Sequence, residues 1–122
     1  MLKQKLTIWG RMFNLDVVFD CYAGEQPTDT QKQALQNIVN SNLDFEQVKQ
    51  NIKTYCLGYD PTIVLDNIFK YVVPQAIYLK RTKDTSRVVG IMCAFKLDIE
   101  HGLAIVFKDE QFVNIVQQDA LL

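Results

Sequence analysis

Residues 87–116 decide the fold, and their sequence is RVVGIMCAFKLDIEHGLAIVFKDEQFVNIV. Two short polar breaks, at residues 99–102 and 109–110, divide this stretch into three strongly apolar runs. Runs rich in β-branched and aromatic residues that are bounded by turn residues are typical of β-strands joined by hairpins. Together with a similar apolar run at residues 76–82, these three runs predict an antiparallel meander of four strands. The predicted strands are residues 76–82, 87–98, 103–108 and 111–116.

The two faces of this predicted meander differ in how they can meet solvent. One face is continuously apolar and can bury against helices. Its residues are Ile77, Leu79, Val89, Ile91, Cys93, Phe95, Leu97, Leu103, Ile105, Phe107, Val113 and Ile115. The other face is less polar than a solvated face should be, and it carries Tyr78, Met92, Ala94, Ala104, Val106 and Val116. Either the N-terminal hairpin or a partner covers this second face, and cover from within the chain is the simpler explanation.

The first half of the chain predicts a β-hairpin and then helices. Period-two alternation over residues 3–22 predicts the hairpin, with its turn near residues 10–14. Thr28 and Gln31 have the spacing of a capping box, which predicts the start of a helix that ends near residues 40–42. Asp44 is a suitable cap for a second helix, whose apolar stripe is Phe45, Val48, Ile52 and Tyr55.

The expected fold class is α+β, in a single domain over residues 1–122. It consists of an N-terminal β-hairpin, two to three helices, and a C-terminal antiparallel four-stranded meander packed on the helices. Residues 57–61 are expected to form a loop, and residues 62–71 fit either a short helix or a strand.

The composition limits the partners and the compartment. The chain has 13 basic and 14 acidic residues and a net charge of -1, whereas a general nucleic-acid binder carries a clear basic excess. The three cysteines, Cys21, Cys56 and Cys93, are an odd number at wide spacing, which does not indicate a disulfide framework, and their apolar settings favour packing over reactivity. The chain has no signal-peptide pattern and no apolar run of about 20 residues. We therefore expect a cytoplasmic protein that binds neither nucleic acid nor membrane.

The candidate functional residues gather in one turn and just after the last predicted strand. Asp98, Glu100 and His101 lie within four residues, and His101 is the only histidine of the chain. Two carboxylates and an imidazole could hold a metal or move a proton. The simpler interpretation is that Gly102 supplies a positive φ while the polar residues close a hairpin, because no second histidine or further ligand is nearby in the sequence. The polar stretch Gln117-Gln118-Asp119 is a second candidate site, in which Gln118 and Asp119 are the candidate binding residues.

The C-terminal third also carries a pattern that resembles a widespread bacterial domain family of unknown function. The matching residues are Phe95, Asp98, Glu100, His101, Gly102, Leu103, Ala104, Ile105, Phe107, Val113, Gln118 and Asp119. Gln117 stands where the family usually has glycine, and Lys96 or Leu97 where it usually has tryptophan. Members are often encoded beside secreted polymorphic toxins, so the resemblance implies an immunity protein that neutralises a toxin by binding it. It implies no catalytic residue.

The leading hypothesis is therefore a non-enzymatic binding protein whose partner is a cognate toxin. Its binding residues would be Asp98, Glu100, His101, Gln118 and Asp119, without a cofactor or a metal. The 27 residues from 96 to 122 contain two lysines and five carboxylates, so they could meet a basic partner. One alternative is a small enzymatic or metal-binding domain that uses the Asp98, Glu100 and His101 turn. Another is a homodimeric scaffold that associates through the part of the second sheet face formed by Tyr78, Met92, Ala104 and Val106, so the chain is expected to be a monomer or a homodimer.

Overall fold

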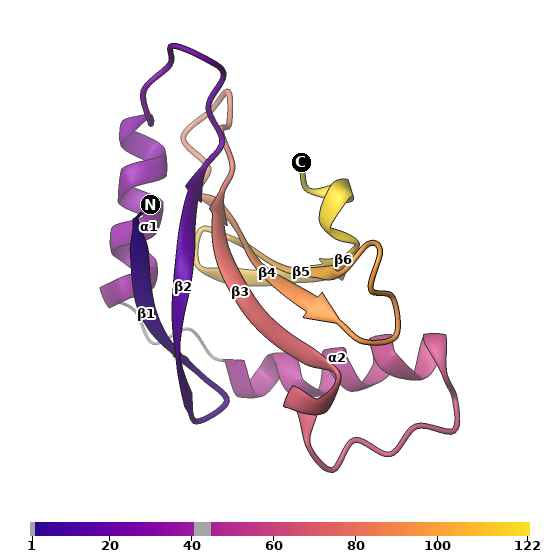
Figure 1. The fold of residues 1–122 in the computed structure, drawn as a ribbon. Coiled ribbons are helices and arrows are strands. Elements are labelled where there is room, and N and C mark those ends of the chain that lie inside the picture. The colour runs from indigo at the N-terminus through magenta and orange to yellow at the C-terminus, as the bar shows by residue number, and fades with distance from the viewer. Residues whose placement is uncertain (1, 41–44) are drawn as a thin grey trace.

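The fold was established from a computed structural model that describes residues 2–40 and 45–122. It contains one six-stranded sheet, two α-helices and two short 3-10 helices (Figure 1). In chain order the elements are β1 (Lys3–Ile8), β2 (Arg11–Phe19), α1 (Asp29–Asn40), α2 (Phe45–Tyr59), η1 (Ile68–Lys70), β3 (Val72–Leu79), β4 (Val88–Phe95), β5 (Leu103–Lys108), β6 (Gln111–Val116) and η2 (Gln118–Ala120). The predicted α+β class, the N-terminal hairpin and the two helices are confirmed.

The strands follow one another across the sheet in the order β1-β2-β3-β4-β5-β6. All neighbours are antiparallel except β2 and β3, which are parallel. The four predicted C-terminal strands do pair antiparallel in chain order, but they are not a pure four-stranded meander, because the hairpin extends the same sheet through the parallel β2–β3 pair. Parallel strands need a long crossover, and α1 and α2 supply it while covering one face of the sheet.

A buried glutamine fixes the point where the crossover begins and ends. The predicted capping box is confirmed: the Gln31 N–H donates to Thr28 Oγ1 at 3.1 Å, and the Thr28 N–H donates to Gln31 Oε1 at 2.8 Å. Gln31 is 1% exposed, and its Nε2 donates at 2.9 Å to the carbonyls of both Asp20 and Leu79. The Gln31 side chain thus joins the start of α1 to the ends of the two parallel strands.

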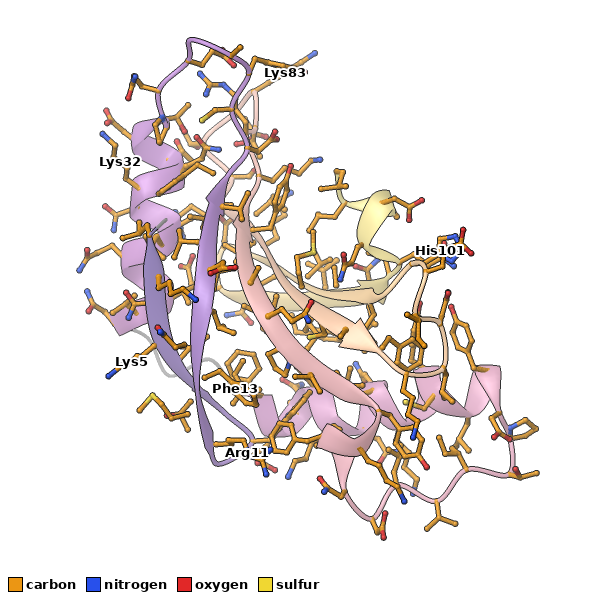
Figure 2. All side chains as sticks on the ribbon, in the orientation of Figure 1. Lys5, Arg11, Phe13, Lys32, Lys83 and His101 are labelled. Atoms are coloured by element: carbon orange, nitrogen blue, oxygen red, sulfur yellow. The ribbon has the colours of Figure 1, made fainter. Side chains whose placement is uncertain are left out.

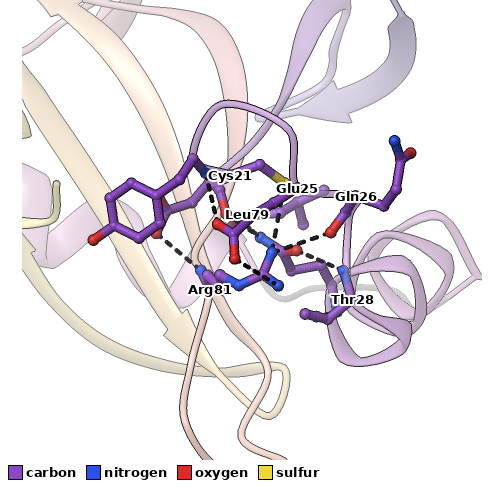
Figure 3. Close-up of polar contacts among 9 residues, drawn as sticks. Cys21, Glu25, Gln26, Thr28, Leu79 and Arg81 are labelled. Atoms are coloured by element: carbon purple, nitrogen blue, oxygen red, sulfur yellow. Dashed lines mark hydrogen bonds and ion pairs between the residues drawn. The ribbon is translucent and has the colours of Figure 1, made fainter.

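Arg81 makes a second set of contacts at this junction. Its guanidinium donates to the Gln26 carbonyl at 3.1 Å and forms an ion pair with Glu25 at 3.3 Å (Figure 3). Its backbone N–H donates to Asp20 Oδ2 at 3.0 Å. The loop between β2 and α1 is therefore tied to the end of β3.

The main core lies between the helices and one face of the sheet. Eleven of the twelve residues of the predicted face are buried or packed against the core. They lie at alternate positions of β3, β4 and β5, together with Leu97 after β4 and Ile115 on β6. Val113 was predicted wrongly, because it is 51% exposed. A bulge opposite Val106 and Phe107 shifts the register, so that Phe112 pairs with Phe107 and takes the core position.

Several boundaries also differ from those predicted. The β1–β2 turn is Trp9-Gly10 and not residues 10–14; both residues have positive φ, as a two-residue type I′ turn requires. The expected loop at residues 57–61 is helical as far as Tyr59. β3 begins at Val72 and passes through Pro74, which the ladder tolerates because a register shift lies there. The expected cap Asp44 lies outside the described residues.

The second sheet face is covered by the C-terminal segment and not by the N-terminal hairpin. Leu121 packs against a small cluster of Tyr78, Met92, Ala104 and Val106, all of them 8% exposed or less. Gly90 makes this approach possible, since a Cβ there would lie 2.1 Å from Leu121 Cδ2. Lys80 Nζ also donates to the Leu121 carbonyl. These four residues of the second face, proposed above for a dimer, are therefore occupied within the chain.

Gln31→Leu should destabilise the protein by about 1–3 kcal/mol, because the Asp20 carbonyl and the Thr28 N–H lose their bonds to the amide in a buried site. Urea unfolding measures the loss. Gln33→Leu, on an exposed face of the same helix, is the matched control and should change stability by no more than about 0.5 kcal/mol. Equal losses in the two variants would contradict the role assigned to Gln31.

Candidate functional site

The predicted Asp98, Glu100 and His101 turn connects β4 to β5. The Asp98 carboxylate accepts from the His101 backbone N–H at 3.3 Å, and His101 Nδ1 lies 2.9 Å from Asp98 Oδ1 and 3.1 Å from Oδ2. The Gly102 N–H donates to the Asp98 carbonyl at 2.9 Å. Asp98 therefore organises the turn through its main chain and its side chain together.

Two further residues complete this cluster: Tyr59, which the sequence analysis missed, and Gln117, which it placed in the separate polar site after the last strand. The Tyr59 hydroxyl donates to Asp98 Oδ2 at 3.2 Å, and Gln117 Nε2 donates to the same oxygen at 3.4 Å. Tyr59 was missed because the end of α2 was predicted to be a loop. Its spacing of four residues from Tyr55 was the available signal, since such residues are neighbours on a helix, and the two rings lie 5.4 Å apart.

The electrostatics of the pair follow from its hydrogen bonds. The bond from His101 lowers the pKa of Asp98, with a smaller contribution from the Tyr59 hydroxyl. The bond to Asp98 raises the pKa of His101, and the charges of Asp98, Glu100 and Asp119 raise it further. The Asp98 side chain is 15% exposed and the His101 side chain 40%, so the carboxylate is sheltered and the ring reaches solvent (Figure 2). Glu100 and Asp119 are exposed and influence the ring through their charge.

The predicted Gln118 meets this turn from the C-terminal side. Its Nε2 donates to the Cys93 carbonyl at 2.9 Å, and its N–H donates to the His101 carbonyl at 3.3 Å. Gly102 has a φ of +60°, as predicted, and a Cβ there would lie 2.5 Å from Gln118 Nε2 and 2.9 Å from the Cys93 carbonyl oxygen. The two separate parts of the sequence pattern thus lie against each other, and glycine is required by backbone conformation and by space.

The chemistry available at the turn is that of a carboxylate–imidazole pair with a solvent-facing ring. Within residues 2–40 and 45–122, no group of three or more histidine, cysteine or acidic residues is placed to hold a metal ion. Cys56 and Cys93 are buried, and burial raises the pKa of both thiols, which disfavours the reactive thiolate. The contacts observed around Asp98 close the hairpin and attach the C-terminal segment to it.

A family model matches residues 3–122 and has the description "Domain of unknown function (DUF6985)". The chain belongs to this family. The expected membership of an uncharacterised domain family is therefore confirmed, and the match includes both the N-terminal hairpin and the C-terminal turn. No curated protein and no solved structure matches the chain. No helix in the described part of the chain is long and apolar enough to cross a membrane.

The helix-free face of this DUF6985 domain contains a broad hollow of about 630 Å³, which we call the sheet hollow. Its lining comes from β1, β2, β3, β4 and the C-terminal segment, and includes Asp16, Val18, Ala76, Tyr78, Met92, Gln118 and Leu122. Val18 is 37% exposed and Leu122 is 69% exposed, whereas Lys3 and Asp16 form an ion pair at 3.2 Å on the side of β1 and β2. The hollow therefore has apolar residues accessible to solvent beside a polar rim.

Tyr78 lines the hollow, and its hydroxyl donates a hydrogen bond to Asp20. Burial, together with the charge of Asp20 and a hydrogen bond to it, raises the pKa of Tyr78 to about 12. The hydroxyl therefore stays protonated at neutral pH. The sequence analysis placed Tyr78 on this face, but only the structure shows that Leu121 covers one side of Tyr78 while the face beside it, at Val18, is open.

Gly102→Ala should destabilise the protein by about 2–3 kcal/mol, because alanine disfavours a positive φ and its Cβ displaces the Gln118 amide. Gly58→Ala is the matched control. Gly58 lies in α2 with open space around its Cβ position, so the change should stabilise by about 0.5–1 kcal/mol. Thermal or urea unfolding distinguishes the two, and a neutral Gly102→Ala would contradict the packing described.

The Asp98 and His101 pair predicts a pH-dependent stability. The lowered pKa of Asp98 stabilises the folded state above the ordinary carboxyl pKa of about 3.9, and this contribution is lost as the pH falls through the lowered value. The raised pKa of His101 stabilises the folded state below the ordinary imidazole pKa of about 6.5, and this contribution is lost as the pH rises through the raised value.

His101→Gln should therefore lower the free energy of unfolding most between pH about 4 and about 6.5, and least above pH about 8. Urea unfolding of both proteins across this range measures the difference. Glu100→Gln leaves the Asp98 hydrogen bonds intact and removes only a smaller charge contribution to the raised pKa of His101, so it should keep most of the pH dependence of the unmodified protein. A loss in His101→Gln that is the same at every pH would rule out a contribution from the charged pair.

Proposed function

We propose that this DUF6985 domain is a non-enzymatic binding protein, and specifically an immunity protein that neutralises a bacterial toxin by occupying its active site. The observation that carries the proposal is the sheet hollow. A sheet face left in water is normally lined with polar residues, yet this one keeps Val18 and Leu122 accessible beside the nearly buried Tyr78 and Met92.

The shape of the hollow supports a protein partner. It spans several strands and is shallow, so a convex loop or a helix could rest in it while the surrounding polar residues formed the rim of an interface. A standard interface buries about 800 Å² on each partner, which a chain with 7156 Å² of accessible surface can provide.

The acidic turn supplies a second reason for this choice. Gln118 lines the hollow and also contacts the His101 turn, so the turn lies at one margin of the hollow. Glu100 and Asp119 are exposed there. A toxin that binds nucleic acid presents basic residues at its active site, and these carboxylates would attract such a surface and speed its association. The domain would act as a plug, and no reaction by its own residues is needed.

Co-expression with the product of the neighbouring gene tests the proposal. We expect the domain to restore growth and to be recovered in a complex with that product. Val18→Asp should weaken the complex at least about tenfold, because it places an unpaired charge in the hollow. Val64→Asp changes an exposed valine in the loop before η1 and should leave binding unchanged.

Circular dichroism shows whether both variants keep the fold. Failure of the domain to restore growth or to form a complex would overturn the immunity role. Equal binding by Val18→Asp and Val64→Asp would remove the sheet hollow from the interface.

A further inference from the structure

A second pocket, separate from the sheet hollow, lies beside α2. It has a volume of about 330 Å³, and we call it the Trp9 pocket. Trp9 and Phe69 contribute aromatic surface to it, and Lys49, Gln50, Lys53 and Asn67 contribute polar groups. Its size is at the lower end of the range for small-molecule sites, which is about 300–1,000 Å³, so it suits a ligand with one or two rings.

Trp9 has an unusual backbone conformation, and its side-chain contacts hold it in place at this pocket. It has a φ of +49°, a region that bulky residues rarely adopt, in a turn type that favours asparagine or glycine. Its indole N–H donates to the Phe45 carbonyl at 2.6 Å, and its ring lies 5.8 Å from that of Phe69. These contacts offset the unfavourable φ and fix the indole beside the start of α2.

The polar side of the pocket is rich in hydrogen-bond donors and positive charge. Lys49 pairs with Glu46 at 3.3 Å, whereas Lys53 has no ion-pair partner within residues 2–40 and 45–122. Asn67 Oδ1 accepts from the Phe69 N–H, which leaves the Asn67 amide group able to donate to a ligand. The only carboxylate of the lining, Asp66, accepts from the Asn67 backbone N–H.

Arg11 adds a further positive charge next to this pocket. Its guanidinium lies 4.4 Å from the centre of the Phe69 ring, and it too has no ion pair in the described part of the chain. A local excess of positive charge in a protein of net charge -1 favours an anionic ligand. The aromatic surface favours a ligand with a flat ring, which can pack on the indole and phenyl rings.

We propose that the Trp9 pocket binds a small aromatic anion. Its ring would pack against Trp9 and Phe69, and its acidic group would accept hydrogen bonds from Lys53 and Asn67. Aromatic carboxylates and mononucleotides share this chemistry. The site does not depend on the proposed immunity role, because it lies outside the sheet hollow and none of its lining residues is shared with it.

Nuclear magnetic resonance offers a direct test, because Trp9 is the only tryptophan and gives a single indole N–H signal. Benzoate and adenosine monophosphate are titrated separately into the labelled protein. We expect at least one of them to shift this signal with saturation, and the one that binds more tightly identifies the source of the ligand. Acetate and benzyl alcohol, which carry only the charge or only the ring, should bind much more weakly.

Lys53→Gln should weaken binding about tenfold, because it removes a charge-assisted hydrogen bond. Lys32→Gln changes an exposed lysine on α1, away from the pocket, and should bind as the unmodified protein does (Figure 2). The same spectra show whether each variant is folded. The proposal is overturned if neither aromatic anion gives a saturable shift, if acetate or benzyl alcohol binds equally well, or if Lys53→Gln binds with unchanged affinity.

Discussion

The parallel pairing of β2 with β3 is the constraint on which the rest of the structure depends. It joins an N-terminal hairpin to a C-terminal meander, and both helices lie between the two paired strands in the chain. Gln31 holds this junction by donating to the Asp20 and Leu79 carbonyls from the first turn of α1. Because these acceptors belong to the ends of the two strands, the amide fixes the helix and the register of the sheet at one point. Both helices are then confined to one face, and the other face carries the C-terminal segment and the sheet hollow.

The C-terminal segment depends on two glycines at positions where the chain approaches itself closely. Gly90 leaves room for Leu121 above β4, and Gly102 leaves room for Gln118 beside the β4–β5 turn. The segment therefore covers β4, β5 and Tyr78 of β3 but not β2, where Val18 remains accessible. The sheet hollow is the consequence of this partial cover. The candidate binding surface is therefore determined by where the C-terminal segment packs on the sheet and not by a sequence motif.

The Asp98 and His101 turn separates the contacts that a sequence can predict from those that it cannot. The local cluster could be found from the sequence because its members are three residues apart, and the need for glycine at position 102 followed from the hairpin. Tyr59 and Gln117 could not be found in this way, since they reach Asp98 from elements that are distant in the chain. Their hydrogen bonds explain why the carboxylate is sheltered while the imidazole still meets solvent.

The sequence by itself determined the secondary structure of most of the chain, the α+β class and most of the main core, because alternation and helical spacing reflect local burial. Only the tertiary structure decided the parallel β2–β3 pairing, the position of Val113 outside the core and the cover of the second face by Leu121. Each of these depends on contacts between distant segments or on a single bulged residue that inverts a strand's pattern. The physical reason is that alternation predicts which residues are buried together on a face, but not which segment will bury them.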